Sequence, residues 1–434
     1  MIETELRHFR SFLFAALHNL TTGERRYHVW MGLLSVVMAV GGFAYIYQVI
    51  HGLGVTGMSD HVSWGLYISN LAFLVGVAAA AVVLVQPAYV LKDVDFSRAV
   101  LIAEGVAVSA LVMCLGFVMA NSPSHPAKWW RLTPIIGLLN WPSSMLAWDV
   151  IMLNGYLALN IMIPFYILYS HYTGRQPEKR KYVPFIYLSV IWAVSIHLVT
   201  AFLFAGLSAR PLWNSALLGP RFLASAFTAG PAFMILLLSF VQSQTRYPIA
   251  PNAISKLATA TTIAAQLNLV MLVSELFYKF YRPTEHSINA RYLYFGIAGH
   301  HELVPWIWTG IGLNTIGTLS LMIHPLRRNL RTLTTACAMI FAGIWVEKGI
   351  GLVIPGFIPS PLGEVVVYKP TWVELCVTCG IWAMGLFLLT VLVRVALPIE
   401  LGESRSPYIK PAPARIIRPR SPRPVTTVRP VRTH

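Results

Sequence analysis

The sequence between residues 62 and 91 reads VSWGLYISNLAFLVGVAAAAVVLVQPAYVL and contains no charged side chain. About 20 consecutive apolar residues allow a helix to cross the hydrocarbon layer of a membrane. The whole chain of 434 residues is 56% hydrophobic and only 12% charged, whereas a soluble domain carries about 25% charged residues. These features predict a polytopic membrane protein. Ten apolar runs are long enough to span a bilayer: residues 29–50, 62–91, 99–120, 144–170, 183–207, 220–243, 253–280, 302–323, 333–357 and 371–397.

The ten runs are predicted to be transmembrane α-helices. They are long and continuous, and they lack the period-two alternation of barrel strands. We expect an all-α fold in which the second to fifth and the sixth to ninth helices form two four-helix bundles, flanked by the first and tenth helices. The expected organisation is an N-terminal segment at 1–28, a membrane domain at 29–402 and a disordered tail at 403–434.

Basic residues predict the orientation of the chain, because Lys and Arg favour the cytoplasmic side. They are concentrated in the loops on the side of the two termini, whereas fewer, including Arg221 and Lys279, are assigned to the opposite loops. Both termini are therefore expected in the cytoplasm, with the chain in the inner membrane and no cleavable signal peptide. The tail is rich in Pro and Arg, which predicts attraction to anionic lipid or docking on a partner subunit. It has no aromatic platform of the kind expected of a nucleic-acid site.

Ionisable side chains inside the apolar runs mark the places where function is expected. Insertion of a charged side chain near mid-membrane costs about 3 kcal/mol, so such a residue is expected to have an interaction partner or a function. All except Glu104 are expected in the extracytoplasmic half of the membrane. The six residues are Glu104, Asp149, His197, Glu275, Glu347 and Lys348.

Asp149 and His197 are expected on consecutive antiparallel helices at comparable depth, so a mutual contact is possible. A quinone exchanges protons together with electrons, and a carboxylate and an imidazole can supply or take those protons. A structural hydrogen bond inside the bundle is the alternative interpretation. Glu104, Glu275, Glu347 and Lys348 are assigned to a proton path, with structural ion pairs as the alternative.

The sequence favours neither a metal site nor a haem. Bis-His ligation needs two facing histidines, and His197 is the only histidine expected well inside a span. The four cysteines also lie in predicted spans, where we interpret them as small packing residues: Cys114, Cys337, Cys376 and Cys379.

Several strings, taken in order along the chain, resemble the NrfD/polysulfide-reductase family of integral membrane subunits. They are HVSWGLYISNLAFLVGVAAAA at 61–81, SHPAKWWRLTP at 124–134, SSMLAWDVIMLNGYL at 143–157 and ARPLWNSALLGPRFLASAFTAGPA at 209–232. SELFYKFYRPTEHSINARYLYFG and VEKGIGLVIPGFIPSPLGE look most like the ten-helix branch of the family, which includes the DsrP, HmcC and HybB subunits.

The resemblance implies a subunit without haem or iron–sulfur cluster. Such a subunit exchanges electrons between menaquinone or ubiquinone and an extracytoplasmic iron–sulfur, ferredoxin-like partner. Further membrane and cytochrome subunits, and a role in dissimilatory sulfur metabolism, are also implied. The family's quinone pocket lies in the first bundle near the outer face, and Asp149 and His197 would be its proton-exchanging residues. The implied pocket residues are Trp64, His125, Trp129, Asp149, Tyr156 and His197.

One departure from the family pattern lies at residues 121–126, which read NSPSHP where relatives often have an acidic residue and a glycine-rich turn. Intramembrane carboxylates also occur in secondary transporters and other ion-translocating subunits, which are the alternative class of function.

Overall fold

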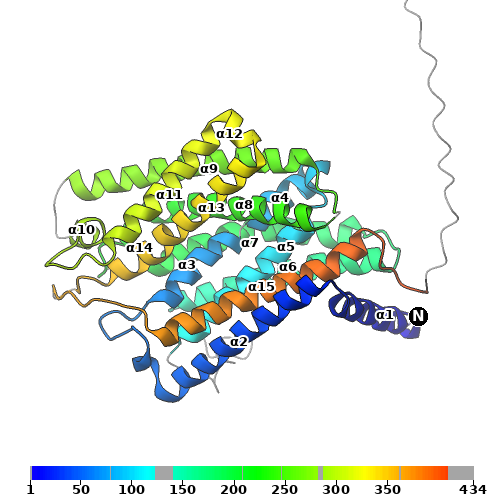
Figure 1. Cartoon of the computed structure of the whole chain (residues 1–434), viewed down its shortest axis with the longest axis horizontal. Helices are drawn as coiled ribbons and strands as arrows, with labels where there is room; N and C mark the ends of the chain where they lie inside the picture. The colour runs from blue at the N-terminus through cyan, green and yellow to red at the C-terminus, as the bar shows by residue number, and fades with distance from the viewer. Residues whose placement is uncertain are drawn as a thin grey trace, which may run out of the picture.

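The protein is a bundle of long helices that run alongside one another (Figure 1). The computed structural model describes residues 2–78, 80–122, 140–207, 209–245, 247–281, 287–360 and 363–408, and no strand occurs within these ranges. The α-helices are α1 (Ile2–Thr21), α2 (Arg25–His51), α3 (Leu66–Ala78), α4 (Ala80–Val85), α5 (Val100–Asn121), α6 (Met145–Tyr172), α7 (Lys179–Ala205), α8 (Leu218–Gln244), α9 (Pro251–Tyr281), α10 (Ile288–Phe295), α11 (Val304–Met322), α12 (His324–Arg328), α13 (Leu330–Ile344), α14 (Gly351–Val353) and α15 (Trp372–Glu400). Shorter helical turns are η1 (Leu53–Val55), η2 (Gln86–Val90), η3 (Val94–Phe96), η6 (Trp345–Ile350) and η7 (Ile354–Gly356).

Helices long and apolar enough to span a membrane dominate the described residues, which confirms the prediction of an all-α polytopic membrane protein. Nine helical stretches in the described ranges meet this criterion: Arg25–His51, Leu66–Tyr89, Val100–Asn121, Met145–Tyr172, Lys179–Ala205, Leu218–Gln244, Pro251–Tyr281, Leu330–Gly356 and Trp372–Glu400.

The eighth expected span is a helix but is not among these nine. Helix α11 has 19 residues and lies within the predicted run at 302–323. Its sequence, VPWIWTGIGLNTIGTLSLM, contains Asn314, three glycines and three threonines, which lower its hydropathy. The count of ten spans is therefore not confirmed by length and composition alone.

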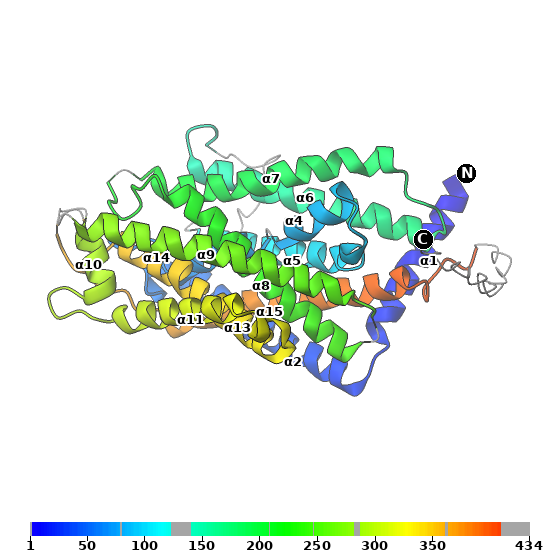
Figure 2. The same ribbon diagram turned by 90° about the horizontal axis from the view of Figure 1, so that it is seen from above.

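The long helices form two groups that lie side by side (Figures 1 and 2). The first contains α3 with α4, α5, α6 and α7, and the second contains α8, α9, α11 and α13. Within each group, neighbouring helices pack directly against one another, and the groups meet where α3 contacts α8 and η6. All 13 residues of α3 are buried. Its central position explains why the sequence at this point is apolar on every side.

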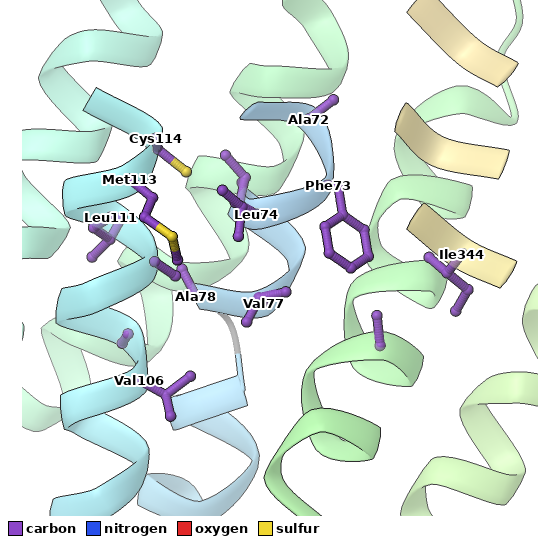
Figure 3. Packing of buried hydrophobic residues seen from close by; sticks show 14 of the residues in the cluster. Ala72, Phe73, Leu74, Val77, Ala78, Val106, Leu111, Met113, Cys114 and Ile344 are labelled. Atoms are coloured by element: carbon purple, nitrogen blue, oxygen red, sulfur yellow. The ribbon is translucent and has the colours of Figure 1, made fainter. Parts of the chain in front are cut away.

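The close packing around α3 shows how the two groups share one hydrophobic core. Cys114 and Met113 on α5 lie beside Leu74 and Ala78 of α3 (Figure 3). Phe73 points to the opposite side of α3, where its ring centroid lies 4.9 Å from that of Phe341 on α13. Cys114 is fully buried, which agrees with its interpretation as a packing residue.

The first and last long helices flank the bundles as a joined pair. Helix α2 packs along α15, and α15 packs on α5. The contact depends on two glycines, because a Cβ atom on Gly41 would lie 2.6 Å from the Cα of Gly380. Close approach of two helix backbones through small residues is typical of membrane helix pairs.

A further helix, α1, occupies the segment before the first expected span. Phe12 packs edge-on against Phe165, Tyr169 and Tyr172 of α6, with centroid separations of 5.8, 5.7 and 5.3 Å. Glu5 forms an ion pair with Arg175. Helix α1 and the end of α15 lie at the same end of the molecule (Figure 2), which we name the terminal end. The opposite end, where α6 begins and α7 finishes, is named the distal end.

We predict that Gly41→Leu destabilises the protein, because the added side chain must push α2 away from α15. Overpacking of this kind costs about 1–3 kcal/mol, so the unfolding midpoint in detergent should fall. Gly42→Leu is the matched control, since a Cβ there has no atom within 4 Å. It should leave stability unchanged or raise it slightly, and equal stability of the two variants would contradict the contact.

Candidate functional site

Asp149 is held in the interior of the first bundle with one carboxylate oxygen unused. It lies four residues after the start of α6, about 6 Å along the helix from the distal end at 1.5 Å per residue. Its side chain is fully buried. Thr200 on α7 donates a 2.6 Å hydrogen bond to Oδ1, and Oδ2 has no hydrogen-bond partner among the described residues. Thr200 thus fixes the carboxylate and leaves Oδ2 able to bind a ligand or a proton.

His197 lies one turn before Thr200 on α7 and is also fully buried. Its Nδ1 lies 2.6 Å from the carbonyl oxygen of Ala193, a geometry in which Nδ1–H donates and Nε2 is left as an acceptor. Nε2 makes no hydrogen bond of normal geometry in the described ranges, although the backbone of Val75 lies close enough to interact with the imidazole. No hydrogen bond or ion pair joins His197 to Asp149 there either. Asp149 contacts Thr200 instead of His197, although the sequence allowed a contact between Asp149 and His197.

An aromatic cluster surrounds Trp64 at the distal end. Trp64 stacks on Trp213 at a centroid distance of 5.8 Å and meets Phe204 edge-on at 5.5 Å. Phe357 contacts both tryptophans, at 5.8 and 5.1 Å. Phe204 belongs to α7, the helix that carries His197. The cluster therefore joins the first bundle to the segment that follows η7.

Glu374, at the start of α15, holds the loop that carries Trp64. Its carboxylate is fully buried and accepts hydrogen bonds from the backbone N–H of Leu66 at 2.9 Å and of Gly57 at 3.1 Å. The hydroxyl of Tyr368 donates to the same carboxylate. Glu374 was not predicted from the sequence, because a residue at the end of a span resembles an ordinary interfacial charge.

The structure describes two of the four remaining expected pocket residues, Trp64 and Tyr156. Tyr156 is buried on α6, seven residues after Asp149 and therefore on the same helix face. Trp64 is described above. His125 and Trp129 lie outside the described residues.

A network of charges ties the second bundle together. Arg221 on α8 forms ion pairs with Glu275 on α9 and, at 3.4 Å, with Glu347 on η6. Lys279 pairs with Glu275 from the next turn of α9. Asn314 on α11 donates a 2.9 Å hydrogen bond to Glu347. The assignment of Arg221 and Lys279 to extracytoplasmic loops is therefore wrong, because their carboxylate partners draw both side chains into the bundle.

Lys348 follows Glu347 but has separate partners. It is buried, donates a 3.2 Å hydrogen bond to the carbonyl oxygen of Phe222 and lies 4.3 Å from the centroid of the Phe222 ring. No carboxylate among the described residues forms an ion pair with it. Lys348 is thus a buried cation stabilised by a carbonyl and an aromatic face.

A small polar cavity adjoins Lys348 and Glu347. Its volume is 30 Å³, and Arg221, Ser225 and Asn268 contribute to its wall. Both polar side-chain atoms of Asn268 lack hydrogen-bond partners among the described residues. A water needs about 10–15 Å³ of such space and two to four polar partners. The cavity therefore has the size and lining to hold water in the middle of the second bundle.

Glu104 is separate from this network. It lies near the start of α5, at the terminal end, and is 3% exposed. Its Oε2 makes no hydrogen bond to a described residue. Glu104 interacts electrostatically with Glu400 of α15, with Tyr89 and with Tyr156 of α6. The four residues assigned to a proton path thus divide between the two ends of the molecule.

This geometry defines a polytopic membrane protein with polar sites buried in its distal half. The chain belongs to the polysulphide reductase NrfD family, whose sequence model matches residues 54–359. Across the described ranges, no group of three or more His, Cys, Asp or Glu side chains could hold a metal ion.

Three curated proteins are similar to this chain. One is a membrane subunit assigned to a dimethyl sulfoxide reductase of Halobacterium salinarum, 24% identical over 426 residues, which cover 87% of this chain and 93% of the relative. Another is a selenate reductase subunit of Mesobacillus selenatarsenatis, 22% identical, covering 60% of this chain and 67% of the relative. A third is the Hdr-like menaquinol oxidoreductase integral membrane subunit of Archaeoglobus fulgidus, 24% identical, covering 60% and 63%.

We predict that Arg221→Met strongly destabilises the fold. Removing one partner of a buried ion pair leaves uncompensated charges and costs about 3–5 kcal/mol. The measurement is the unfolding free energy of the purified protein in detergent. Lys181→Met is the control, because the pair of Lys181 with Glu178 is exposed. It should produce no measurable change, and stability equal to wild type in Arg221→Met would show that the network is not structural.

Proposed function

We propose that this chain is the quinone-interacting membrane subunit of a redox complex. The observation that carries the proposal is the pair of unused polar atoms, Asp149 Oδ2 and His197 Nε2, buried in one bundle near its distal end. A buried polar atom without a partner is costly. Such atoms are commonly completed by a ligand or a water.

The proposed chemistry follows from the two groups. Oxidation of a quinol releases two electrons and two protons, and reduction of a quinone takes up the same number of each. Asp149 and His197 can each accept or donate one proton at a quinone oxygen. Thr200 holds Asp149 in position, and the carbonyl of Ala193 orients the imidazole. The aromatic wall around Trp64 suits the flat ring of a quinone.

Electrons must pass to or from another subunit, because a quinone can be oxidised or reduced only when a second redox group accepts or supplies the electrons. We propose an extracytoplasmic iron–sulfur partner that docks at the distal end, with further membrane and cytochrome subunits. The names of the relatives support this proposal, since they include subunits of two reductases and an integral membrane subunit of a menaquinol oxidoreductase. The quinone would be menaquinone or ubiquinone.

The orientation and branch of the family belong to the same proposal. We propose that the terminal end is cytoplasmic, because its loops are rich in Lys and Arg, and that α11 is the tenth span. Burial of Arg221 and Lys279 in ion pairs removes two positive charges from the distal loops and strengthens this argument. A place in the ten-helix, DsrP-like branch and in dissimilatory sulfur metabolism is proposed on the sequence resemblance.

We predict that Asp149→Asn lowers quinol-linked electron transfer at least tenfold while the complex still assembles. The amide keeps the volume and the contact with Thr200 but cannot exchange a proton. The measurement is quinol-dependent reduction of the purified partner complex, together with the set of subunits that purifies with the chain. Asp60→Asn is the control, since Asp60 is an exposed carboxylate at the distal end.

Normal turnover in Asp149→Asn would exclude Asp149 as a proton-exchanging residue. His197→Phe should show the same loss of turnover, and failure of this variant to fold would indicate a structural role for His197. Uptake of a solute by the isolated chain, without quinol-dependent electron transfer in the complex, would favour a secondary transporter and overturn the redox proposal.

A second function, proton movement, is favoured by the network in the second bundle. Glu275 and Glu347 share Arg221, and Glu347 and Lys348 border the polar cavity that contains Asn268. Glu104 supplies a buried carboxylate at the opposite end of the molecule. We propose that protons enter near Glu104 and reach Glu347 through the water-sized cavity.

We predict that Glu347→Gln and Glu104→Gln each reduce proton movement per electron at least twofold in reconstituted vesicles, with less effect on quinone affinity. Neutral amides keep hydrogen bonding but cannot carry the proton. Glu178→Gln is the control, because Glu178 is exposed at the terminal end. Unchanged proton movement in both variants, with normal electron transfer, would leave these residues as structural groups.

A further inference from the structure

An apolar cleft opens at the distal end, on the side of α3 that faces α13 and α15. Its walls come from α3, α11, α13, η6 and α15, and most of the lining surface is carbon. Three tryptophans line it: Trp306, Trp345 and Trp382. Trp306 is 54% exposed at the edge of the cleft, so the cleft is continuous with the outer apolar surface. The candidate pocket of the first bundle involves other residues.

Asn70 lines the cleft and makes three hydrogen bonds within the protein. Asn70 Oδ1 accepts hydrogen bonds from Trp345 Nε1 at 3.1 Å and Trp382 Nε1 at 2.9 Å. Its Nδ2 donates to the carbonyl oxygen of Leu66 at 2.8 Å. The hydroxyl of Tyr368 is committed to Glu374. Most of the cleft interior is therefore hydrocarbon. Thr378 is the exception, because it lines the cleft and its hydroxyl has no hydrogen-bond partner among the described residues.

The mouth of the cleft is charged, unlike its apolar interior. Glu302 and Lys369 both line it and interact electrostatically, although they form no direct ion pair among the described contacts. The Glu302 side chain is 34% exposed, and its Oε2 has no hydrogen-bond partner in the described part of the chain. The pKa of Glu302 lies below its usual range, first because of its own backbone N–H and then because of His300. Glu302 is therefore an anion at neutral pH, and Lys369 is an exposed cation beside it.

We propose that this cleft binds a zwitterionic phospholipid, with an acyl chain between Trp306, Trp345 and Trp382 and the headgroup at Lys369 and Glu302. Lys369 pairs with the phosphate. The ammonium of an ethanolamine headgroup donates to Glu302 Oε2 and neutralises its charge. Phosphatidylglycerol can pair with Lys369 through its phosphate and can donate to Glu302 from a hydroxyl, but it has no cation to neutralise the carboxylate. The site therefore favours phosphatidylethanolamine over phosphatidylglycerol.

Native mass spectrometry of the full chain, reconstituted with equal amounts of palmitoyl-oleoyl phosphatidylethanolamine and phosphatidylglycerol, tests this site. We predict retention of phosphatidylethanolamine with at least threefold preference. Glu302→Gln should remove the preference, and Lys369→Gln should reduce retention of both lipids at least threefold. Both changes lie outside the spanning helices, so folding should be preserved. No preference in wild type, or an unaltered preference in Glu302→Gln, overturns the headgroup assignment.

A variant with a large side chain inside the cleft tests the position of the acyl chain. Ala342 on α13 is exposed and lines the cleft, so Ala342→Trp should reduce lipid retention at least fivefold. Ala338→Trp is the matched control, because Ala338 is exposed one turn earlier on α13 and does not line the cleft. Equal retention in the two variants, or release of a quinone rather than a phospholipid from wild type, overturns the proposal. Quinol-linked turnover should persist in Ala342→Trp, which separates this site from the candidate quinone pocket.

Discussion

The need to neutralise Arg221 inside the membrane domain constrains the whole second bundle. An isolated charge in a low-dielectric interior costs several kcal/mol, and the cost is recovered only when partners are placed accurately. The partners of Arg221 come from α9 and η6, and Asn314 of α11 supports one of them. One guanidinium group therefore fixes the relative positions of four helices. The π-helical turn η6 belongs to the same arrangement, because it directs Glu347 and Lys348 to different partners.

This constraint extends to the first bundle through direct contacts. Lys348 binds the carbonyl and ring face of Phe222 on α8. The ring of Phe222 lies 5.9 Å from that of Phe204 on α7, and Phe204 packs on Trp64 and Trp213. A continuous path of packed side chains therefore joins the charged network to the helix that carries His197. Coupling of quinone chemistry to proton movement would require a physical connection of this kind.

The helical fold was predictable because spanning helices need long apolar runs, and the sequence contains them. Helix α11 was harder to classify, since its Asn314 and small polar residues serve contacts inside the bundle rather than the lipid. Arg221 and Lys279 were misplaced because a basic residue near the end of a span can either extend to the surface or turn inward. The choice depends on Glu275, which lies far from Arg221 in the sequence but pairs with it in the bundle.

The burial of Asp149 and His197 was predictable from the sequence, but their contacts were only partly so. Burial of Asp149 and His197 follows from their place in apolar runs, and the structure confirms it. The role of Thr200 could not be read from the sequence, because several hydroxyl residues on α7 could face α6. Glu374 was missed for a related reason. Its carboxylate accepts hydrogen bonds from backbone N–H groups of a loop more than 300 residues earlier in the chain.

Unsatisfied polar atoms distinguish the functional interior from a merely stable one. Arg221 and Glu374 have their partners within the chain, so folding is sufficient to explain them. Asp149 Oδ2, His197 Nε2 and the amide of Asn268 do not, although each is buried among the described residues. Replacing them with apolar groups would remove a desolvation cost of about 1–3 kcal/mol per group. Retention of these polar atoms indicates that a species outside the chain forms hydrogen bonds with them. A proton-exchanging ligand and internal water are the species that could do so.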